Sequence, residues 1–282
     1  MKKNIYYFLF LLNSFVFSCI YLKGQSYLVH KYLKEDGLPS NIVFDVCQDK
    51  NANMWFSTKS GITRYDGTEW TYFKQNNPSA KKEYKFISKD SDGNIWAISD
   101  NSGLAISEFD GNSWSEIFVS DAVEFHTGII TSFILLEKNG KKLPLYASDA
   151  GGLFILYNKE LNSVQKLSKQ RINSLKIFNS VCYIVTDKLV YTTSDGQKFP
   201  VLNLSQKLPA NFSIKDISVD KSGKIYFLGD GEIAEITDTK MLVHKLGYSP
   251  EKIFIDDYYG SLVLGGSGVI LLWDKISKNS KR

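Results

Sequence analysis

The chain has 282 residues, of which 43% are hydrophobic and 23% charged, a balance that excludes a disordered protein. This length fits one large domain or two small ones, and a net charge of +4 without a concentrated basic stripe argues against nucleic-acid binding. Aromatic residues make up 14% of the chain. Because aromatic side chains pack well on pleated strands, a β-rich fold is expected.

Residues 1–24 have the features of a secretory signal peptide. Two lysines precede an apolar run over residues 5–20, and the run is short for a membrane span. We therefore expect cleavage near residue 24 and export to the periplasm or cell surface. Two alternatives stay open: residues 16–19 resemble a lipoprotein cleavage site with Cys19 as the lipidated residue, and an uncleaved segment would be an N-terminal membrane anchor.

The two cysteines outside this segment are expected to be buried, unpaired thiols. Cys47 and Cys182 lie in apolar, strand-like runs that are far apart in the sequence. A disulfide between them is the alternative in an oxidising compartment, but their spacing does not suggest one.

One sequence unit recurs along the rest of the chain. Residues 48–67 and 89–111 both run from a polar turn through a Trp and a short strand to a second strand and Asp-Gly, and the two Trp residues are 41 positions apart. Weaker copies, with a Tyr or Val near the Trp position, occupy residues 141–158, 180–196, 223–238 and 260–274. A period of roughly 40–45 residues with several short strands in each copy is typical of a β-propeller blade.

Each copy is expected to supply four antiparallel strands and almost no helix. In the first copy the strands are predicted at residues 42–49, 53–58, 61–66 and 69–74. Polar residues and glycines between the first two strands, and Asp-Gly between the last two, are the residues that tight hairpins favour.

The two ends of the repeat region predict how the propeller closes. The last copy has three strand-like runs and no fourth, whereas residues 27–33 form a strand without a blade of its own. A propeller of six blades over residues 27–274 is expected, in which the N-terminal strand completes the last blade, followed by a basic tail at residues 275–282. The alternative is an incomplete seven-bladed propeller.

The first copy, residues 37–67, closely resembles the repeat of the two-component regulator propeller family. The pattern departs at Asn53, which replaces the turn Gly, and at Ser57, which replaces a strand Gly. The residues that carry the resemblance are Gly37, Leu38, Pro39, Ser40, Asn41, Val43, Val46, Gln48, Asp49, Trp55, Phe56, Thr58, Gly61, Arg64, Tyr65, Asp66 and Gly67.

The resemblance implies a sensing or binding function. Propellers of that family are periplasmic sensor parts of hybrid two-component systems in Bacteroidota, and their ligands are often glycan fragments. We find no kinase, ATP-binding, helix-turn-helix or second membrane segment in this sequence, so no output module is expected in this chain. The expected partners are an oligosaccharide or small-molecule ligand and a membrane signalling protein, and not nucleic acid. The alternative is an exported scaffold or adhesion module that binds protein or surface glycan without signalling.

The residues that first suggest chemistry have structural explanations. Trp55 and Trp96 lie mid-strand among apolar residues, which favours core packing over sugar stacking. Asp66 and Asp110 precede Gly and are expected to fix turns. Residues 90–94 are rich in Asp and Asn but lack the Glu that an EF-hand needs at position twelve.

No metal site, cofactor or catalytic constellation is expected, so the chain is interpreted as a non-enzyme. The three His residues are scattered and lack metal-ligand spacing. Residues 265–268 do not complete a nucleophile-elbow motif and are interpreted as a turn.

Topology alone indicates where a ligand would bind. In a propeller, the loops between strands two and three share one face with the connections between blades, and loops on a rigid scaffold often carry function. Residues 120–128 are expected to form a lip over the central channel, and Thr58, Lys59 and Ser60, at a hairpin tip, are expected to face a ligand. The candidate ligand-binding residues are Asn41, Lys59, Tyr84, Asp100, Asn101, His126, Asp149, Asp187 and Asp230.

Overall fold

The structure is a computed structural model that divides into two units, Met1–Gly37 and Leu38–Arg282. In the first unit, a 3-10 turn at Lys34–Asp36 is capped by Asp36, whose carboxylate accepts the N–H of Leu33 at 2.8 Å. The residues that the structure describes are 32–73, 83–99, 103–120, 128–150, 152–164, 167, 170–236, 241–255, 262–266, 269–274 and 279–281.

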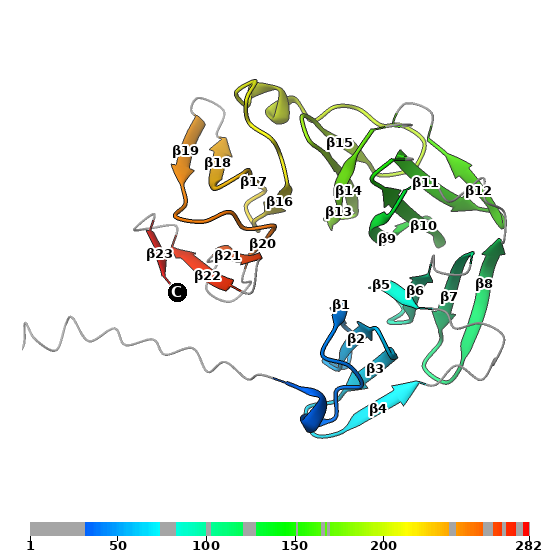
Figure 1. Cartoon of the computed structure of the whole chain (residues 1–282). Helices are drawn as coiled ribbons and strands as arrows, with labels where there is room; N and C mark the ends of the chain where they lie inside the picture. Colours follow the sequence, from blue (N-terminus) through cyan, green and yellow to red (C-terminus); the bar gives the residue numbers. More distant parts are fainter. Residues whose placement is uncertain are drawn as a thin grey trace, which may run out of the picture. The chain divides into compact units, whose positions relative to one another are not determined.

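The larger unit consists of antiparallel sheets whose strands follow one another in chain order, numbered here sheet 1 to sheet 6 (Figure 1). Sheet 1 contains β1 (Val43–Gln48), β2 (Met54–Thr58), β3 (Gly61–Tyr65) and β4 (Trp70–Phe73). Sheet 2 contains β5 (Tyr84–Lys89), β6 (Ile95–Ser99), β7 (Leu104–Phe109) and β8 (Trp114–Ser120). Sheet 3 contains β9 (Ile130–Lys138), β10 (Lys141–Ser148), β11 (Gly152–Tyr157) and β12 (Glu160–Ser163).

The second half of the unit continues the pattern. Sheet 4 contains β13 (Ile172–Phe178), β14 (Val181–Thr186) and β15 (Val190–Thr193), and sheet 5 contains β16 (Asp216–Val219), β17 (Ile225–Leu228), β18 (Glu232–Ile236) and β19 (Met241–Lys245). Sheet 6 contains β20 (Lys252–Ile255), β21 (Leu262–Gly266), β22 (Val269–Asp274) and β23 (Asn279–Lys281). This repetition of four-stranded meanders confirms the predicted all-β propeller fold.

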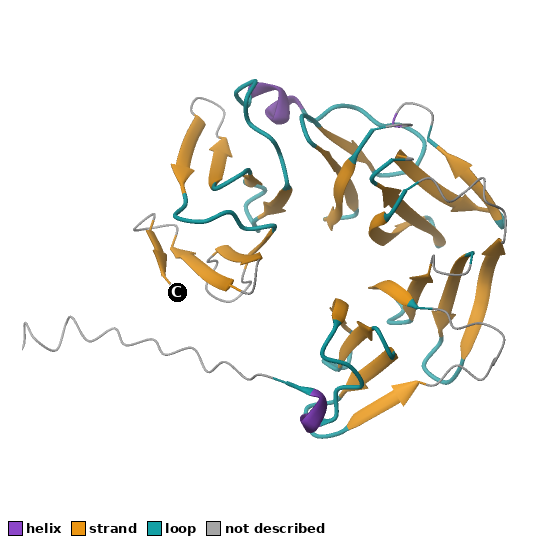
Figure 2. Cartoon of the chain, viewed as in Figure 1, coloured by secondary structure: helices purple, strands orange, loops and turns teal. Residues whose placement is uncertain are grey.

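Helical structure is minor, as expected. A 3-10 helix covers Asn203–Lys207, and strands account for most of the described residues (Figure 2). Among the residues that the structure describes, no helix has the length and apolar character needed to cross a membrane.

The core lies between consecutive sheets rather than inside any one of them. A separate apolar cluster fills each interface from sheets 1 and 2 through to sheets 5 and 6. Trp55 joins Ile87 and Phe109 in the first cluster, and Trp96 joins Phe133 and Tyr146 in the second. The prediction that both Trp side chains pack between blades is therefore confirmed.

Sheet 4 differs from the predicted four strands because its outer strand is reduced to a single bridge. Tyr191 pairs with Val201, and the flanking bonds run from Thr192 N to the Pro200 carbonyl at 2.9 Å and from Leu202 N to the Val190 carbonyl at 2.7 Å. Pro200 has no N–H to extend the ladder, and the 3-10 helix begins at Asn203.

The expectation that sheet 6 lacks a fourth strand of its own is wrong. β23 pairs with β22 through Asp274 and Asn279, so the predicted basic tail contributes a strand to this sheet. The hairpin leaves one edge of β22 available, and the C-terminal residues occupy it. Residues 27–31 lie outside the described residues, so closure by the N-terminal strand stays a prediction.

Candidate functional site

In sheets 1, 2 and 5, the carboxylate of an Asp that follows the first strand accepts hydrogen bonds from the next turn and from a side chain of the second strand. In sheet 2, Asp90 Oδ1 accepts the N–H of Asn94 at 2.8 Å, while its Oδ2 accepts Trp96 Nε1 at 3.0 Å and Lys142 Nζ at 2.6 Å. This segment therefore forms a hairpin turn, as predicted, and its carboxylate is paired with a lysine. Across the described residues, no cluster of His, Cys, Asp and Glu is suited to a metal ion.

The Asp-Gly turns are also structural, as predicted. Asp66 Oδ1 accepts the N–H groups of Thr68 and Glu69, both at 2.8 Å. These bonds, led by the one from Glu69, lower the pKa of Asp66 to about 2. Asp110 makes the equivalent bonds to the backbone of its own turn.

Four of the predicted ligand-binding residues lie in the loops between the second and third strands of their sheets. Lys59, Asp149 and Asp187 directly follow the second strand, and Asp230 lies two positions after the end of β17. Asn41 precedes β1 and is exposed, next to Ile42, whose carbonyl accepts the N–H of Lys59 at 3.0 Å. That these residues share one face, and that they bind a ligand, stays a prediction.

The three carboxylates in these loops already bind neighbouring connections. Asp149 Oδ1 accepts the N–H of Ile129 at 2.7 Å, and Asp187 Oδ1 accepts Asn173 Nδ2 at 2.9 Å. Asp230 pairs with Lys215 Nζ at 3.1 Å and also accepts the hydroxyl of Ser249. Each carboxylate therefore stabilises a segment at or just before the first strand of a sheet.

The placement of Tyr84 on an exposed loop is wrong. Tyr84 begins β5, is only 6% exposed, stacks on Trp114 and lies 2.9 Å from Ser107 through its hydroxyl. Its apolar ring contributes to the interface between sheets 1 and 2, which explains its burial. Thr58 at the predicted hairpin tip is also buried, and its hydroxyl donates to the Gly61 carbonyl at 2.8 Å. Lys59, by contrast, is exposed.

The remaining candidates, Asp100, Asn101 and His126, lie outside the described residues, as do residues 121–127 of the predicted lip. Their place in the site stays a prediction.

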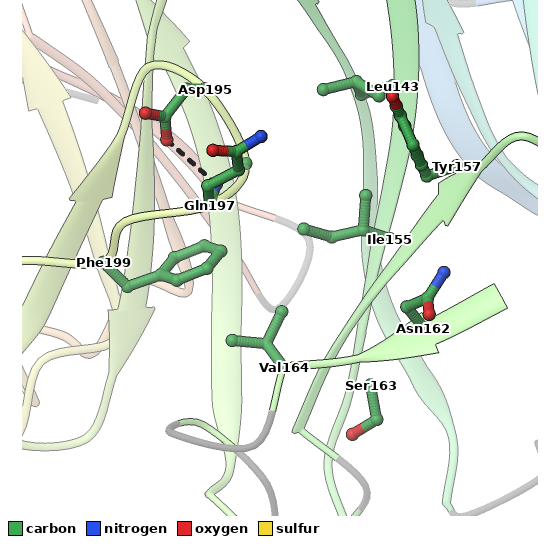
Figure 3. A pocket seen from close by; sticks show the side chains of 10 residues that line it. Leu143, Ile155, Tyr157, Asn162, Ser163, Val164, Asp195, Gln197 and Phe199 are labelled. Carbon is green, nitrogen blue, oxygen red and sulfur yellow. Dashed lines mark hydrogen bonds between the residues drawn. The ribbon is translucent and has the colours of Figure 1, made fainter.

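A pocket that sequence reasoning missed lies beside β10, β11 and β12 of sheet 3, under the segment that follows β15 (Figure 3). Its volume is about 520 Å³. Apolar side chains form one part of the wall and polar ones the other; the lining residues are Leu143, Ile155, Tyr157, Asn162, Ser163, Val164, Asp195, Gly196, Gln197 and Phe199.

The polar part of the pocket is ordered by local bonds. Asp195 Oδ1 accepts the N–H groups of Gln197 at 2.9 Å and Lys198 at 3.0 Å, and these bonds lower the pKa of Asp195 (Figure 3). Lys141 Nζ donates to the hydroxyl of Tyr157 at 3.2 Å and lies 5.2 Å from its ring centroid. This bond lowers the pKa of Tyr157.

This combination of surfaces suits a small polar ligand with an apolar face. Concave sites that bind small molecules are commonly apolar, with a few placed polar groups that fix orientation. Among the ten lining residues, Asp195 is the single carboxylate, whereas glycoside hydrolysis usually requires two.

Polar side chains also line the first strands of the sheets, where consecutive sheets meet. Ile87 N donates to Asp45 Oδ2 at 3.1 Å, and Ile253 N donates to Asp216 Oδ2 at 3.2 Å. Asp216 is fully buried and pairs with Lys176 Nζ at 3.1 Å. Burial raises the pKa of Asp45, against smaller opposing effects of backbone hydrogen bonds and nearby lysines.

Comparison with known families agrees with the resemblance seen in the first repeat. A family model described as "Two component regulator propeller" matches residues 37–60, which include β1 and β2. The chain therefore carries a repeat of this type in sheet 1. No curated protein matches the chain in sequence.

Solved structures share the propeller fold at low sequence identity. Virginiamycin B lyase from Staphylococcus aureus is 10% identical with a TM-score of 0.64, over 85% of this chain and 83% of that one. The extracellular domain of a hybrid two component system from B. thetaiotaomicron is 17% identical with a TM-score of 0.64, over 88% of this chain and 35% of that one. YCF48 bound to D1 peptide is 13% identical with a TM-score of 0.59, over 82% and 77%.

These similar structures include an enzyme, the extracellular domain of a two component system and a peptide-bound protein. At such identities the likeness shows the fold alone. The chain spans about a third of the B. thetaiotaomicron domain's length.

Proposed function

We propose that this chain is an exported, non-enzymatic ligand-binding propeller of the sensor type, which binds an oligosaccharide or another small polar ligand in the pocket beside sheet 3. The pocket is the observation that carries the proposal, because it joins an apolar wall to hydroxyl, amide and carboxylate groups. Tyr157 offers a ring face at the pocket, and Asn162, Asp195 and Gln197 offer hydrogen-bonding groups to ligand hydroxyls.

The sensor role rests on the repeat match and on the similar extracellular domains of two component systems. The N-terminal segment directs the chain out of the cytoplasm, and a separate membrane protein transmits the signal. The proposal that the chain is not an enzyme draws support from the single carboxylate of the pocket.

A thermal-shift screen of residues 25–282 against a panel of neutral and acidic oligosaccharides tests this function. A ligand that binds only the folded state stabilises it by about 2.7 kcal/mol at a concentration of 100 Kd, which raises Tm by about 5 °C or more in a domain of this size.

Matched variants locate the binding. Tyr157→Ala is expected to abolish the ligand-induced shift, whereas Tyr72→Ala, which alters a tyrosine with the same exposed fraction of 42% on sheet 1, is expected to keep it. A screen without any stabilising ligand would count against the proposed function. A shift that survives Tyr157→Ala would place the ligand elsewhere.

A further inference from the structure

Equivalent positions of the repeat reveal an uncovered face on sheet 1. On the first strand of each sheet, one side chain points at the preceding sheet. In sheets 2 to 6 this side chain is 0–4% exposed; the residues are Ile87, Phe133, Leu175, Ile217 and Ile253. The counterpart in sheet 1 is Val46, which is 48% exposed. The face that carries Val46 therefore has an apolar residue where the other sheets form an interface, but no sheet covers it.

On sheet 6, the uncovered face is the one that would point at a following sheet. On the third strand of each sheet, one side chain points at the following sheet. In sheets 1 to 5 it is 0–3% exposed; the residues are Ile62, Ile106, Leu153, Val190 and Ile233. The counterpart in sheet 6 is Ile270, which is 69% exposed. Sheet 6 therefore lacks the cover that every other sheet receives.

The two uncovered faces do not cover each other, because Val46 and Ile270 are both exposed in the same structure. They lie on the first and the last sheet of the series. The charge of Lys252 on β20 is among the causes that lower the pKa of Asp45 on β1, against the larger raising effect of burial.

We propose that these two faces, defined as the Val46 face of sheet 1 and the Ile270 face of sheet 6, form one docking surface for a further four-stranded antiparallel sheet carried by a partner polypeptide. The interfaces within the chain show what such a surface accepts, because each joins the same two kinds of face. A partner sheet that is apolar on both sides satisfies both ends at once.

The inner strands specify one polar contact of this partner. Asp45, Ser132 and Asp216 occupy one repeat position, and each accepts an N–H from the first strand of the next sheet at 3.1–3.2 Å. In sheet 6 this position holds Lys252, which donates and cannot accept. The inner strand of the partner sheet therefore offers a carboxylate or another acceptor to Lys252.

A lone strand, such as the one predicted at residues 27–33, does not meet these requirements. A strand extends an edge by pairing with its backbone, whereas the uncovered faces span several strands and need a second layer of side chains. This proposal is independent of the pocket and its ligand.

The first test asks whether the Val46 face is open in the isolated chain. Val46→Lys is expected to change Tm by less than about 2 °C, since a lysine at an exposed site stays in water, whereas Ile217→Lys at the equivalent buried position is expected to lower Tm by more than about 10 °C or to prevent folding. An equal loss in both variants would overturn the proposal, because the face would then already be covered.

The second test supplies a sheet. The probe is the chain's own sheet 2, residues 84–120, fused after Arg282 through a Gly-Ser linker, with a scrambled fusion of the same composition as control. The intact fusion is expected to raise Tm by about 5 °C relative to the scrambled one, and to make Val46→Lys destabilising. A fusion that neither raises Tm nor makes Val46→Lys destabilising would overturn the proposal.

Light scattering of the unfused chain provides the remaining check. A monomer is expected at micromolar concentration. An oligomer that both Val46→Lys and Ile270→Lys dissociate, but that Val119→Lys on the outer strand of sheet 2 leaves intact, would show a second copy to be the occupant and would overturn the partner-sheet proposal.

Discussion

The indole Nε1 of Trp55 donates a hydrogen bond of 2.9 Å to Oδ2 of Asp49, across six positions of the chain. The other carboxylate oxygen of Asp49 accepts the N–H groups of Asn51 and Asn53, both at 2.9 Å. One carboxylate therefore fixes a hairpin and also satisfies the polar atom of a buried aromatic ring.

Removal of this carboxylate is expected to destabilise the propeller. Asp49→Ala leaves the buried indole N–H without its partner at a cost of about 1–3 kcal/mol, equivalent to a Tm decrease of about 3–10 °C. Asp66→Ala, on an exposed turn, is the control and is expected to cost less. In a double-mutant cycle, Asp49→Ala should cost less in a Trp55→Phe background, and additive losses would contradict the coupling.

Acid is expected to weaken the fold through the same group of carboxylates. Burial raises the pKa of Asp49 and Asp90, but hydrogen bonds and, at Asp90, Lys142 outweigh it, so both are lowered. Their stabilisation is therefore complete above the unfolded pKa of about 3.9 and is lost as the pH falls through the lower folded values. Urea unfolding at pH 7, 4 and 2.5 should show the loss below pH 4, with a smaller loss in Asp90→Asn. An unchanged loss in that variant would contradict the assignment.

Asp45 is expected to behave in the opposite way. Burial raises its pKa, so the folded chain prefers the protonated carboxyl, and stability present below the unfolded pKa is lost as the pH rises through the folded one. Asp45→Asn retains an oxygen that can accept the N–H of Ile87. It should raise Tm at pH 7 and change it little at pH 3. A lower Tm at pH 7 would show that the nearby lysines dominate.

Both cysteines of the larger unit are expected to resist alkylation in the folded state. Burial raises the pKa of Cys182 and raises that of Cys47 to about 12, and the thiolate is the reactive form. Both are free thiols in the structure; Cys182 is buried as expected, whereas the expected burial of Cys47 is wrong, because its side chain is only half-buried. Iodoacetamide at pH 8 should label neither in the native protein and both in 6 M urea, as measured by intact mass. Rapid native labelling would show that one thiol becomes accessible through local opening.

The sequence was sufficient to predict the fold because the repeat encodes it locally. Trp55 and Trp96 mark the second strands, and Asp-Gly marks the turns, so period and turn chemistry together indicate propeller blades. Sheet 4 departs from this pattern, since Pro200 and the following 3-10 helix stand where an outer strand is expected.

The candidate site was harder to predict because it depends on contacts between distant segments. Tyr84 is predicted to lie in a loop, but its ring fills the interface between two sheets. The pocket joins Leu143 and Tyr157 of sheet 3 to Phe199 beyond sheet 4, and no local pattern relates these residues. Only the Asp195-Gly196 turn at its rim is visible as a motif.

The apolar clusters between consecutive sheets also determine the order in which the sheets unfold. A sheet whose contacts are confined to its immediate neighbours resembles one unit of a linear array, in which stability is a sum of nearest-neighbour terms. Sheets 3 and 4 are held from both sides, whereas sheets 1 and 6 each have one uncovered face. Unfolding therefore proceeds inward from the two ends, and backbone amides of β10 and β14 outlast those of β1 and β20 in hydrogen exchange.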